Sequence, residues 1–332
     1  MKIKLSHGAG GKEGAELINK LILKYLGNDI LSKMEDSAVL AGCNKLAFTT
    51  DSFIVKPLFF PGGNIGKLAV CGTLNDLAVM GATPKYLSLS HIIEEGFEIE
   101  DLETIVKTLG EECRQAGVMV VCGDTKVAEN GAVDSIFINT SGIGVFESDK
   151  KFSISEAKEG DLIIVSGTIG EHGIAILNAR KEISFSSDLI SDCAVLYPLI
   201  KNMMASGAKI HSMRDATRGG LSAVVNEMGI ASQVSVLIKE ELVPVTSSVQ
   251  SVCNLFGFNP MELANEGRVV IAVAKEDAQE LVSVMQAHPL GTGAKIIGEV
   301  QKKQAFPALL ETRLGVKNIL EMPRGELLPR IC

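Results

Sequence analysis

The sequence contains no tryptophan, and aromatic residues make up only 5% of its 332 residues. Because hydrophobic residues still account for 46%, the core must be built mainly from valine, isoleucine, leucine and alanine, and the chain is long enough for two domains. No apolar run approaches the roughly 20 residues that span a bilayer, and residues 1–12 lack the apolar core of a signal peptide. We therefore expect a globular, cytoplasmic protein with no membrane partner.

The sequence also lacks an excess of basic residues. Its formal net charge is −8 and no cluster of lysine and arginine stands out, so we expect no nucleic-acid partner. The seven cysteines form no Cys-x-x-Cys pair, and there is no His-Glu-x-x-His motif, so neither a standard zinc site nor a disulfide framework is indicated. Most of the cysteines are expected to be small buried side chains.

Hydrophobic patterning predicts helices and strands in alternation through the first half of the chain. The helices are expected around residues 18–25, over 65–80 and over 102–116, and the strands over 46–50, 118–122 and 135–146. Asp51 is expected at the end of the first strand and Asp124 just beyond the second, where open α/β folds usually place functional groups.

The polar stretch 147–160 is the expected boundary between two domains. A second α/β set follows, with strands over 161–165 and 269–274 and helices over 193–205, 221–228 and 278–285. Residues 321–332 contain prolines and a glycine that neither a helix nor a central strand accommodates, so we expect a mobile arm. The predicted parts are therefore residues 1–148, residues 149–320 and the tail 321–332.

Three aspartates of the first half, Asp51, Asp76 and Asp124, lie beside threonine, serine or asparagine in otherwise apolar surroundings. Taken singly, each reads as a helix cap or a turn residue. If they converge in space, they suit Mg²⁺, which prefers oxygen ligands and often binds through a few carboxylates plus nucleotide phosphates.

Four more residues carry groups suited to phosphate binding or proton transfer. Lys126 and Arg218 are either phosphate ligands or surface charges. Glu266 is either a base or an ion-pair partner of nearby Arg268. His7, in a glycine-dense loop that is a phosphate cradle or a plain turn, is an acid–base candidate or a solvated histidine.

The last residue is a cysteine, Cys332, at the end of the predicted arm. Terminal segments fray unless something holds them, so this thiol is either a reachable nucleophile or an idle side chain at a loose end. The neighbouring α-carboxylate raises the pKa of such a thiol while Arg330 lowers it, and the sign of the net shift is open.

Together these motifs closely resemble the HypE family of hydrogenase maturation factors over essentially the whole chain. The motifs are His7-Gly8-Ala9-Gly10-Gly11, Thr50-Asp51-Ser52, Asn75-Asp76, Gly123-Asp124-Thr125-Lys126-Val127, Asp215-Ala216-Thr217-Arg218-Gly219-Gly220 and Pro329-Arg330-Ile331-Cys332. The internal motifs are also similar to those of the wider PurM-like superfamily of ATP enzymes, which includes aminoimidazole ribonucleotide synthetase. The terminal cysteine distinguishes HypE among them.

The resemblance implies a mixed α+β and α/β fold of the two-domain PurM-like type. An N-terminal ATP-binding domain would form a β-barrel with that of a second subunit, and a C-terminal α/β domain would carry the flexible tail. The implied enzyme is an ATP-dependent carbamoyl dehydratase. HypF would load a carbamoyl group onto Cys332, ATP-driven dehydration would give a thiocyanate, and the cyanide would pass to iron on a HypC–HypD complex, for [NiFe] hydrogenase.

The resemblance also implies roles for individual residues. The metal ligands for Mg²⁺ would be Asp51, Asp76 and Asp124, with Asp36 less securely placed. ATP would be bound by Gly10, Gly11, Asp51, Asn75, Asp76, Asp124, Thr125, Arg218 and Gly219. Cys332 would accept the carbamoyl group, Lys126 would contact phosphate or the carbamoyl tail, and His7 or Glu266 would transfer the proton.

Two positions depart from the family pattern, Ala9 where serine is frequent and Ala216 where proline is frequent. Both leave the glycines and charged groups in place. Two other functions compete with the dehydratase: a same-fold ATP-dependent kinase or synthetase acting on a free small substrate, and a non-catalytic thiol carrier. A selenophosphate synthetase would need a reactive residue near the N-terminus, yet no cysteine precedes Cys43.

Overall fold

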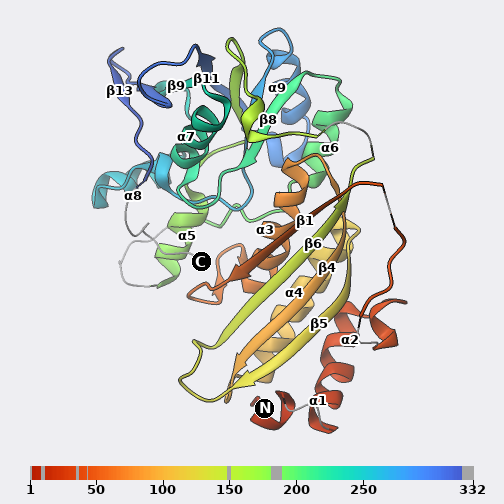
Figure 1. The fold of residues 1–332 in the computed structure, drawn as a ribbon. Coiled ribbons are helices and arrows are strands. Elements are labelled where there is room, and N and C mark those ends of the chain that lie inside the picture. The colour runs from red at the N-terminus through yellow and green to blue at the C-terminus, as the bar shows by residue number, and fades with distance from the viewer. Residues whose placement is uncertain are drawn as a thin grey trace.

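The computed structural model describes residues 2–8, 12–34, 37–42, 44–147, 151–180 and 189–323. Two β-sheets, one from each half of the chain, lie at opposite ends of the molecule with helices packed between and around them (Figure 1). Of the residues predicted to be functional, Gly10, Gly11, Asp36 and Cys332 lie outside these ranges, as do Ala9, Cys43 and tail residues 324–332.

The first half contains a four-stranded sheet in the order β1-β6-β4-β5. Its strands are β1 (Leu46–Phe53), β4 (Thr83–Glu94), β5 (Met119–Ala128) and β6 (Ile136–Val145). Only β4 and β5 run parallel, which fits their connection through a helix. A short pair, β2 (Phe59–Phe60) and β3 (Gly63–Asn64), leads into the first long helix.

Two helices cover one face of this sheet, α3 (Ile65–Val79) and α4 (Ile99–Ala116). The predicted apolar face of α4 is confirmed, since Leu102, Ile105 and Leu109 are fully buried. Nearly every residue of α3 is buried, because the sheet contacts it on one side and elements of the second half contact it on the other. This helix therefore lies at the junction of the two halves.

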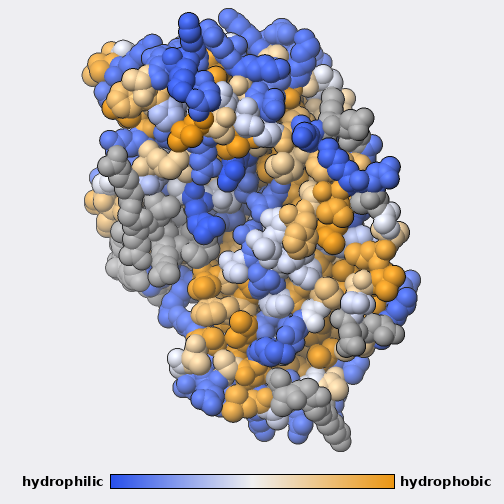
Figure 2. All heavy atoms as spheres, viewed as in Figure 1, coloured by the Kyte–Doolittle hydropathy of each residue, from blue (hydrophilic) through white to orange (hydrophobic). Residues whose placement is uncertain are grey.

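The other face of the same sheet carries exposed apolar side chains. Phe48 is 64% exposed, Leu46 51% and Ile92 43%. The surface in Figure 2, drawn from the same side as Figure 1, is a mixture of apolar and polar side chains over these strands. We call this surface, formed by the outward residues of β1, β6, β4 and β5, the open face.

The N-terminal helical segment packs beside β5 and α4. It consists of η1 (Leu5–Gly8), α1 (Lys12–Leu17), η2 (Ile18–Ile22), α2 (Leu23–Leu26) and η3 (Leu31–Lys33). The helix predicted around 18–25 is thus confirmed, with Leu21 and Leu26 buried in the core.

The second half contains a seven-stranded sheet in the order β13-β12-β9-β11-β7-β10-β8. The strands are β7 (Leu162–Val165), β8 (Ile210–Asp215), β9 (Ser235–Lys239), β10 (Val269–Val273), β11 (Lys295–Gln301), β12 (Ala308–Glu311) and β13 (Lys317–Ile319). The helices are α5 (Glu171–Arg180), α6 (Tyr197–Ala205), α7 (Gly220–Ser232), α8 (Ser247–Phe256) and α9 (Ala278–Gln286). Single turns η4 (Ile154–Glu156), η5 (Glu240–Leu242), η6 (Pro260–Glu262) and η7 (Pro289–Gly291) complete the half.

Some predicted boundaries were wrong. Strand β1 continues past Asp51 to Phe53, and Gly123 to Lys126 lie inside β5 instead of after it. Ladder pairing with β6 and β4 holds these residues extended although aspartate and glycine are poor strand formers. The helix expected from residue 193 begins at Tyr197. The predicted domain boundary at residue 148 falls on 148–150, outside the described ranges, and stays a prediction.

No helix within the described ranges is both long enough and apolar enough to cross a membrane. Four of the cysteines that the structure describes, Cys71, Cys113, Cys193 and Cys253, are buried, and Cys122 is half-buried. The expectation that most cysteines pack as small apolar side chains is therefore confirmed for this part of the chain.

Candidate functional site

A group of carboxylates gathers where α3 meets both sheets. Asp51 projects from β1 towards α3, as shown by its carboxylate lying 3.9 Å from the position of a Cβ on Gly72. Asp76, on α3, accepts a hydrogen bond from the Thr49 hydroxyl at 2.8 Å. Asp215 ends β8, which contacts α3 from the second half. Two halves of the chain thus contribute to one acidic site.

The electrostatics of this site follow from burial and from repulsion between the carboxylates. Burial and the charge of Asp76 raise the pKa of Asp51 to about 6. The same two causes raise the pKa of Asp215 to about 7. Burial also raises the pKa of Asp76, opposed by the Thr49 hydrogen bond and by the charges of Arg214 and Arg218. Holding these carboxylates ionised is costly without a cation.

These residues fit a Mg²⁺ ion held together with a phosphate group. Within the described ranges, no three or more His, Cys, Asp or Glu side chains stand close enough to hold a metal ion by themselves. Mg²⁺ usually binds through one or two carboxylates, substrate phosphates and waters, so a sparse carboxylate set with raised pKa values suits it. Asp51, Asp76 and Asp215 are the residues that would hold it.

Asp124 does not join this group within one chain. It pairs with Ser90 on β4, which pairs with Asn139 on β6, which in turn pairs with Ser52, the neighbour of Asp51. Because successive strand residues point to opposite faces, Asp124 lies on the open face while Asp51 faces α3. Three strand spacings, roughly 14 Å, also separate β5 from β1. The predicted convergence of Asp124 with the other two is therefore not seen.

Asp124 instead forms a second polar group with its neighbours on β5. Its carboxylate accepts from the Lys126 ammonium at 3.0 Å and from the Thr125 amide at 2.9 Å. The hydrogen bond from Lys126 lowers the pKa of Asp124, so this carboxylate is ionised at neutral pH. All three residues line a cavity of about 550 Å³ between β5 and the N-terminal helical segment, and His7 lines it as well.

The wall of this cavity is mostly apolar, with polar side chains on one side. His91 lines it with a buried Nε2 that has no partner among the described residues, and burial lowers the pKa of this ring to about 4. The Nδ1 atom of His7 accepts a hydrogen bond from the Lys4 amide at 3.0 Å. An apolar cavity with a few converging polar groups is typical of small-molecule sites.

Glu266 lies at the acidic site and not at this cavity. Its side chain is buried, and burial, together with the charges of Asp192, Asp215 and Asp51, raises its pKa well above the usual value, opposed by Arg218. A carboxyl whose protonated form is favoured by its surroundings is a candidate for acid–base work. The two proton-transfer candidates, His7 and Glu266, are therefore at different sites.

Arg218 and Gly219 lie at the start of α7, beside the acidic site. The charge of Arg218 acts on Asp51, Asp76 and Glu266 alike, which places its exposed guanidinium where it can meet a phosphate. Gly219 has a φ of +75°, a conformation that glycine adopts without strain.

Asn75, predicted to contact nucleotide, has its amide committed elsewhere. Its nitrogen donates to the carbonyl oxygens of Ala194 at 3.0 Å and Glu266 at 3.3 Å, and its oxygen accepts from the Leu196 amide at 2.7 Å. Asn75 therefore ties α3 to the loop that carries Glu266.

Sequence reasoning missed Asp215 and Asp192. Asp215 ends an apolar strand and opens the motif quoted for Arg218, so its position at a strand end was an available signal. Asp192 offered no such signal. Of the two alternatives for Glu266, the ion pair with Arg268 is not seen: Arg268 pairs with Asp192 and Glu171.

Comparisons with known proteins agree with this architecture. The N-terminal domain of AIR synthase related proteins matches residues 34–146, and the C-terminal domain matches residues 158–308. Carbamoyl dehydratase HypE of Escherichia coli strain K12 is 44% identical over 99% of both chains. A crystal structure of the hydrogenase maturation protein HypE in complex with ATP superposes with a TM-score of 0.95, at 41% identity and 99% coverage of both chains.

A structure of a HypE–HypF complex matches with a TM-score of 0.81 at 46% identity, covering 92% of this chain and 99% of that one. The resemblance read from the motifs and the two-domain PurM-like fold are both confirmed. The chain belongs to the AIR synthase related proteins and, within them, to the HypE family.

Proposed function

We propose that this protein is an ATP-dependent carbamoyl dehydratase that converts a carbamoyl group on its own Cys332 into a thiocyanate. Membership of the HypE family supports this function. The observation that carries it is the acidic site, where Asp51, Asp76 and Asp215 lie with Arg218 next to the buried Glu266. Groups for binding a charged phosphate donor and a group for moving a proton thus meet at one place.

The reaction has two steps. The carbamoyl oxygen attacks the γ-phosphorus of ATP, which forms a C–O–P linkage and releases ADP, while one of the two N–H protons is lost and a C=N bond replaces the C=O bond. A base then removes the remaining N–H proton, the C–O bond breaks, and phosphate leaves with that oxygen, so that a C≡N bond remains on sulfur. The activation is needed because an amide oxygen is otherwise a poor leaving group.

Individual residues take the following roles in the proposal. Asp51, Asp76 and Asp215 hold Mg²⁺, which when bound spreads the charge of the transferred phosphoryl group. Arg218 meets the phosphate, and Glu266 accepts the N–H proton during elimination.

Residues of the second polar group act at a junction between two subunits. Asp124 and Lys126 lie on or beside the open face, whose exposed Phe48 and Leu46 favour burial against a second copy of the chain. A homodimer formed by the open faces, with a barrel shared between the subunits, would bring Asp124, Thr125 and Lys126 of one subunit towards the nucleotide of the other. His7, at the same cavity, would act there.

The proposed partners follow from the family. HypF supplies the carbamoyl group, as the solved HypE–HypF complex suggests for this chain. A HypC–HypD complex receives the cyanide for the iron of [NiFe] hydrogenase. A cytoplasmic location stays a prediction.

The first experiment follows the mass of the C-terminal peptide. The protein is incubated with HypF and its carbamoyl donor, and the peptide ending in Cys332 is measured before and after Mg-ATP is added. We expect gain of a carbamoyl group and then ATP-dependent loss of one water. The Cys332→Ala variant should bind ATP and gain nothing.

The alternative functions give different results in this experiment. Loading without loss of water would contradict the dehydratase and indicate a passive thiol carrier. Absence of loading on a folded, ATP-binding protein would indicate a kinase or synthetase acting on a free substrate.

A further inference from the structure

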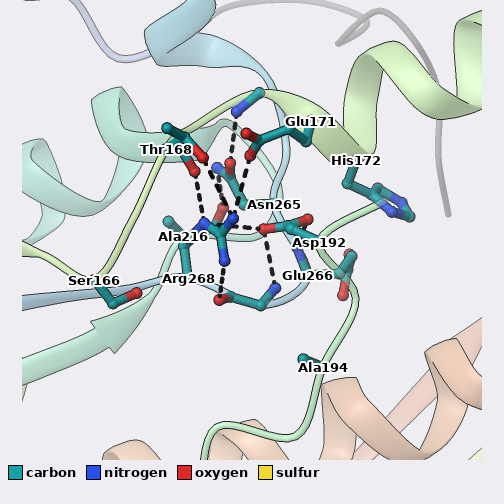
Figure 3. Close-up of polar contacts among 12 residues, drawn as sticks. Ser166, Thr168, Glu171, His172, Asp192, Ala194, Ala216, Asn265, Glu266 and Arg268 are labelled. Atoms are coloured by element: carbon teal, nitrogen blue, oxygen red, sulfur yellow. Dashed lines mark hydrogen bonds and ion pairs between the residues drawn. The ribbon is translucent and has the colours of Figure 1, made fainter. Parts of the chain in front are cut away.

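The backbone that carries Glu266 is held by the side chain of Asp192, in the segment before α6 (Figure 3). One carboxylate oxygen of Asp192 accepts from the Glu266 amide at 3.0 Å, and the other accepts from the Gly267 amide at 3.2 Å. The Asp192 side chain is only 1% exposed. Both of its oxygens therefore contribute to fixing the position of one short stretch of backbone.

The approach of the two segments is unusually close at Gly267. A Cβ on this residue would lie 1.9 Å from the carbonyl oxygen of Asp192, a distance that no side chain tolerates. The loop of Glu266 is therefore pressed directly against the backbone of the Asp192 segment.

Arg268 fixes Asp192 in turn. Its Nε lies 3.7 Å from the Asp192 carboxylate and donates to the Thr168 carbonyl oxygen at 2.6 Å. Its other nitrogens reach the Glu171 carboxylate at 3.3 Å and the Gly267 carbonyl oxygen at 3.1 Å. Figure 3 shows the guanidinium surrounded by Thr168, Glu171 and Asp192. The planar guanidinium of Arg268 thus links the Glu266 loop, to which Arg268 belongs, to Asp192 and to Glu171 at the start of α5.

A third contact comes from the first half of the chain. Asn75, beside Asp76 on α3, donates to the carbonyl oxygens of Glu266 and Ala194. The peptide group before the Glu266 Cα is therefore hydrogen-bonded by Asp192, and the peptide group after it by both Asp192 and Asn75.

We propose that Asp192 is a positioning residue for dehydration. It acts through Glu266: together with Arg268, it holds the Glu266 carboxylate against the carbamoyl group. The inference rests on the proposed function. A base must lie within hydrogen-bond reach of its proton, and small displacements of catalytic groups cost large factors in rate.

The arrangement serves placement more than stability. Burying the charged groups of Asp192, Glu171 and Arg268 costs solvation that their attraction only partly returns, so such a cluster is weak evidence of stabilisation. The position of this charged cluster beside Glu266 instead favours a role in placing that residue.

The test replaces Asp192 by asparagine, which keeps its shape and removes its charge and one acceptor. In the carbamoyl-loaded protein, Asp192→Asn should lower the single-turnover rate of dehydration by about 10- to 100-fold, as loss of an orienting contact does. Carbamoyl loading and the affinity for Mg-ATP should stay within about twofold. An Asp192→Asn protein that dehydrates at the wild-type rate would overturn the inference.

Two further variants separate positioning from general destabilisation. In a Glu266→Gln background, Asp192→Asn should add less than about threefold, because a residue that acts only through Glu266 has nothing left to position. Asp161→Asn is the matched control: Asp161 is also a buried aspartate of the second half that accepts a backbone amide, from Lys158 at 2.8 Å. Equal losses in Asp161→Asn and Asp192→Asn would indicate a structural effect and contradict the proposal.

If Asp192→Asn does not fold, Arg268→Lys replaces it, since lysine keeps the charge and loses the fork. A selective loss of dehydration is expected again, and an unchanged rate would overturn the inference. Failure of the wild-type protein to dehydrate its loaded cysteine would instead contradict the proposed function itself.

Discussion

Ionisation of the buried Asp215 carboxyl lowers the stability of the folded protein. Its pKa in the folded protein is about 7, raised by burial and by Asp76 from an ordinary value of 3.8. A raised carboxyl pKa means that the folded state binds more protons than the unfolded state between these two values. Stability is therefore lost as pH rises from about 4 to about 7, and the full cost is present at pH 8.

We therefore expect Asp215→Asn to stabilise the ligand-free protein at pH 8 but not at pH 4. Each pKa unit corresponds to about 1.4 kcal/mol, so the gain in unfolding free energy at pH 8 should be about 1–4 kcal/mol. Denaturant unfolding at both pH values measures it. Asp124→Asn is the control, since Lys126 lowers the pKa of Asp124, and no gain at pH 8 is expected there. A destabilised Asp215→Asn at pH 8 would contradict the expectation.

At this scale, sequence reasoning found Asp51, Asp76, Arg218 and Glu266, and the structure brings them together. It did not separate Asp124 from them, because side-chain direction on β5 depends on a register that only the folded sheet sets. It also assigned Asn75 to nucleotide, because an amide beside a carboxylate shows nothing of its partners across the domain junction.

Helix α7 begins at Gly220, whose backbone packs tightly against the segment around Leu263. Gly220 has a φ of +57°, and a Cβ there would lie 2.4 Å from the Leu263 carbonyl oxygen. Gly220→Ala should therefore lower the free energy of unfolding by about 1–3 kcal/mol, through strain and a backbone clash together.

Thermal or denaturant unfolding measures this loss, with Gly257→Ala as the matched control. Gly257 has a similar φ of +73°, but nothing lies within 4 Å of the added Cβ. Its loss should be smaller, since only the conformational strain remains. Equal losses would show that the Leu263 contact contributes nothing.

Element type was predictable wherever an apolar pattern was long. The amphipathic period of α4 and the apolar run of α3 both identified helices. The ends of β1 and β5 were not predictable, because polar residues that continue a paired strand are indistinguishable from a turn until the partner strand is known.

At the scale of whole molecules, the open face is the surface through which we propose that two copies of the chain pair. Phe48, on the edge strand β1, is 64% exposed and lies on the same face as further apolar side chains of β1 and β4. If two copies pair through this face, Phe48→Lys buries a charge at the interface, and the dimer should dissociate at micromolar concentration.

Sedimentation velocity measures the change in mass. Leu314→Lys serves as control, since Leu314 is 90% exposed in the second half, away from the open face, and its replacement should leave the dimer intact. A Phe48→Lys protein that stays dimeric would place the interface elsewhere. The two-domain architecture was predicted through the motif resemblance, but the strand order of each sheet was not, because it joins residues far apart in the chain.

Adjacent positions of α3 serve two different tasks, since Asp76 faces the acidic site and Asn75 grips the loop of Glu266. Helix α3 therefore sets the distance between the acidic site, where we propose that phosphate binds, and the proposed base Glu266. Hinging the halves apart at this junction would separate Glu266 from Asn75 and from Asp76. We therefore expect that the two halves cannot be exchanged between proteins as independent units.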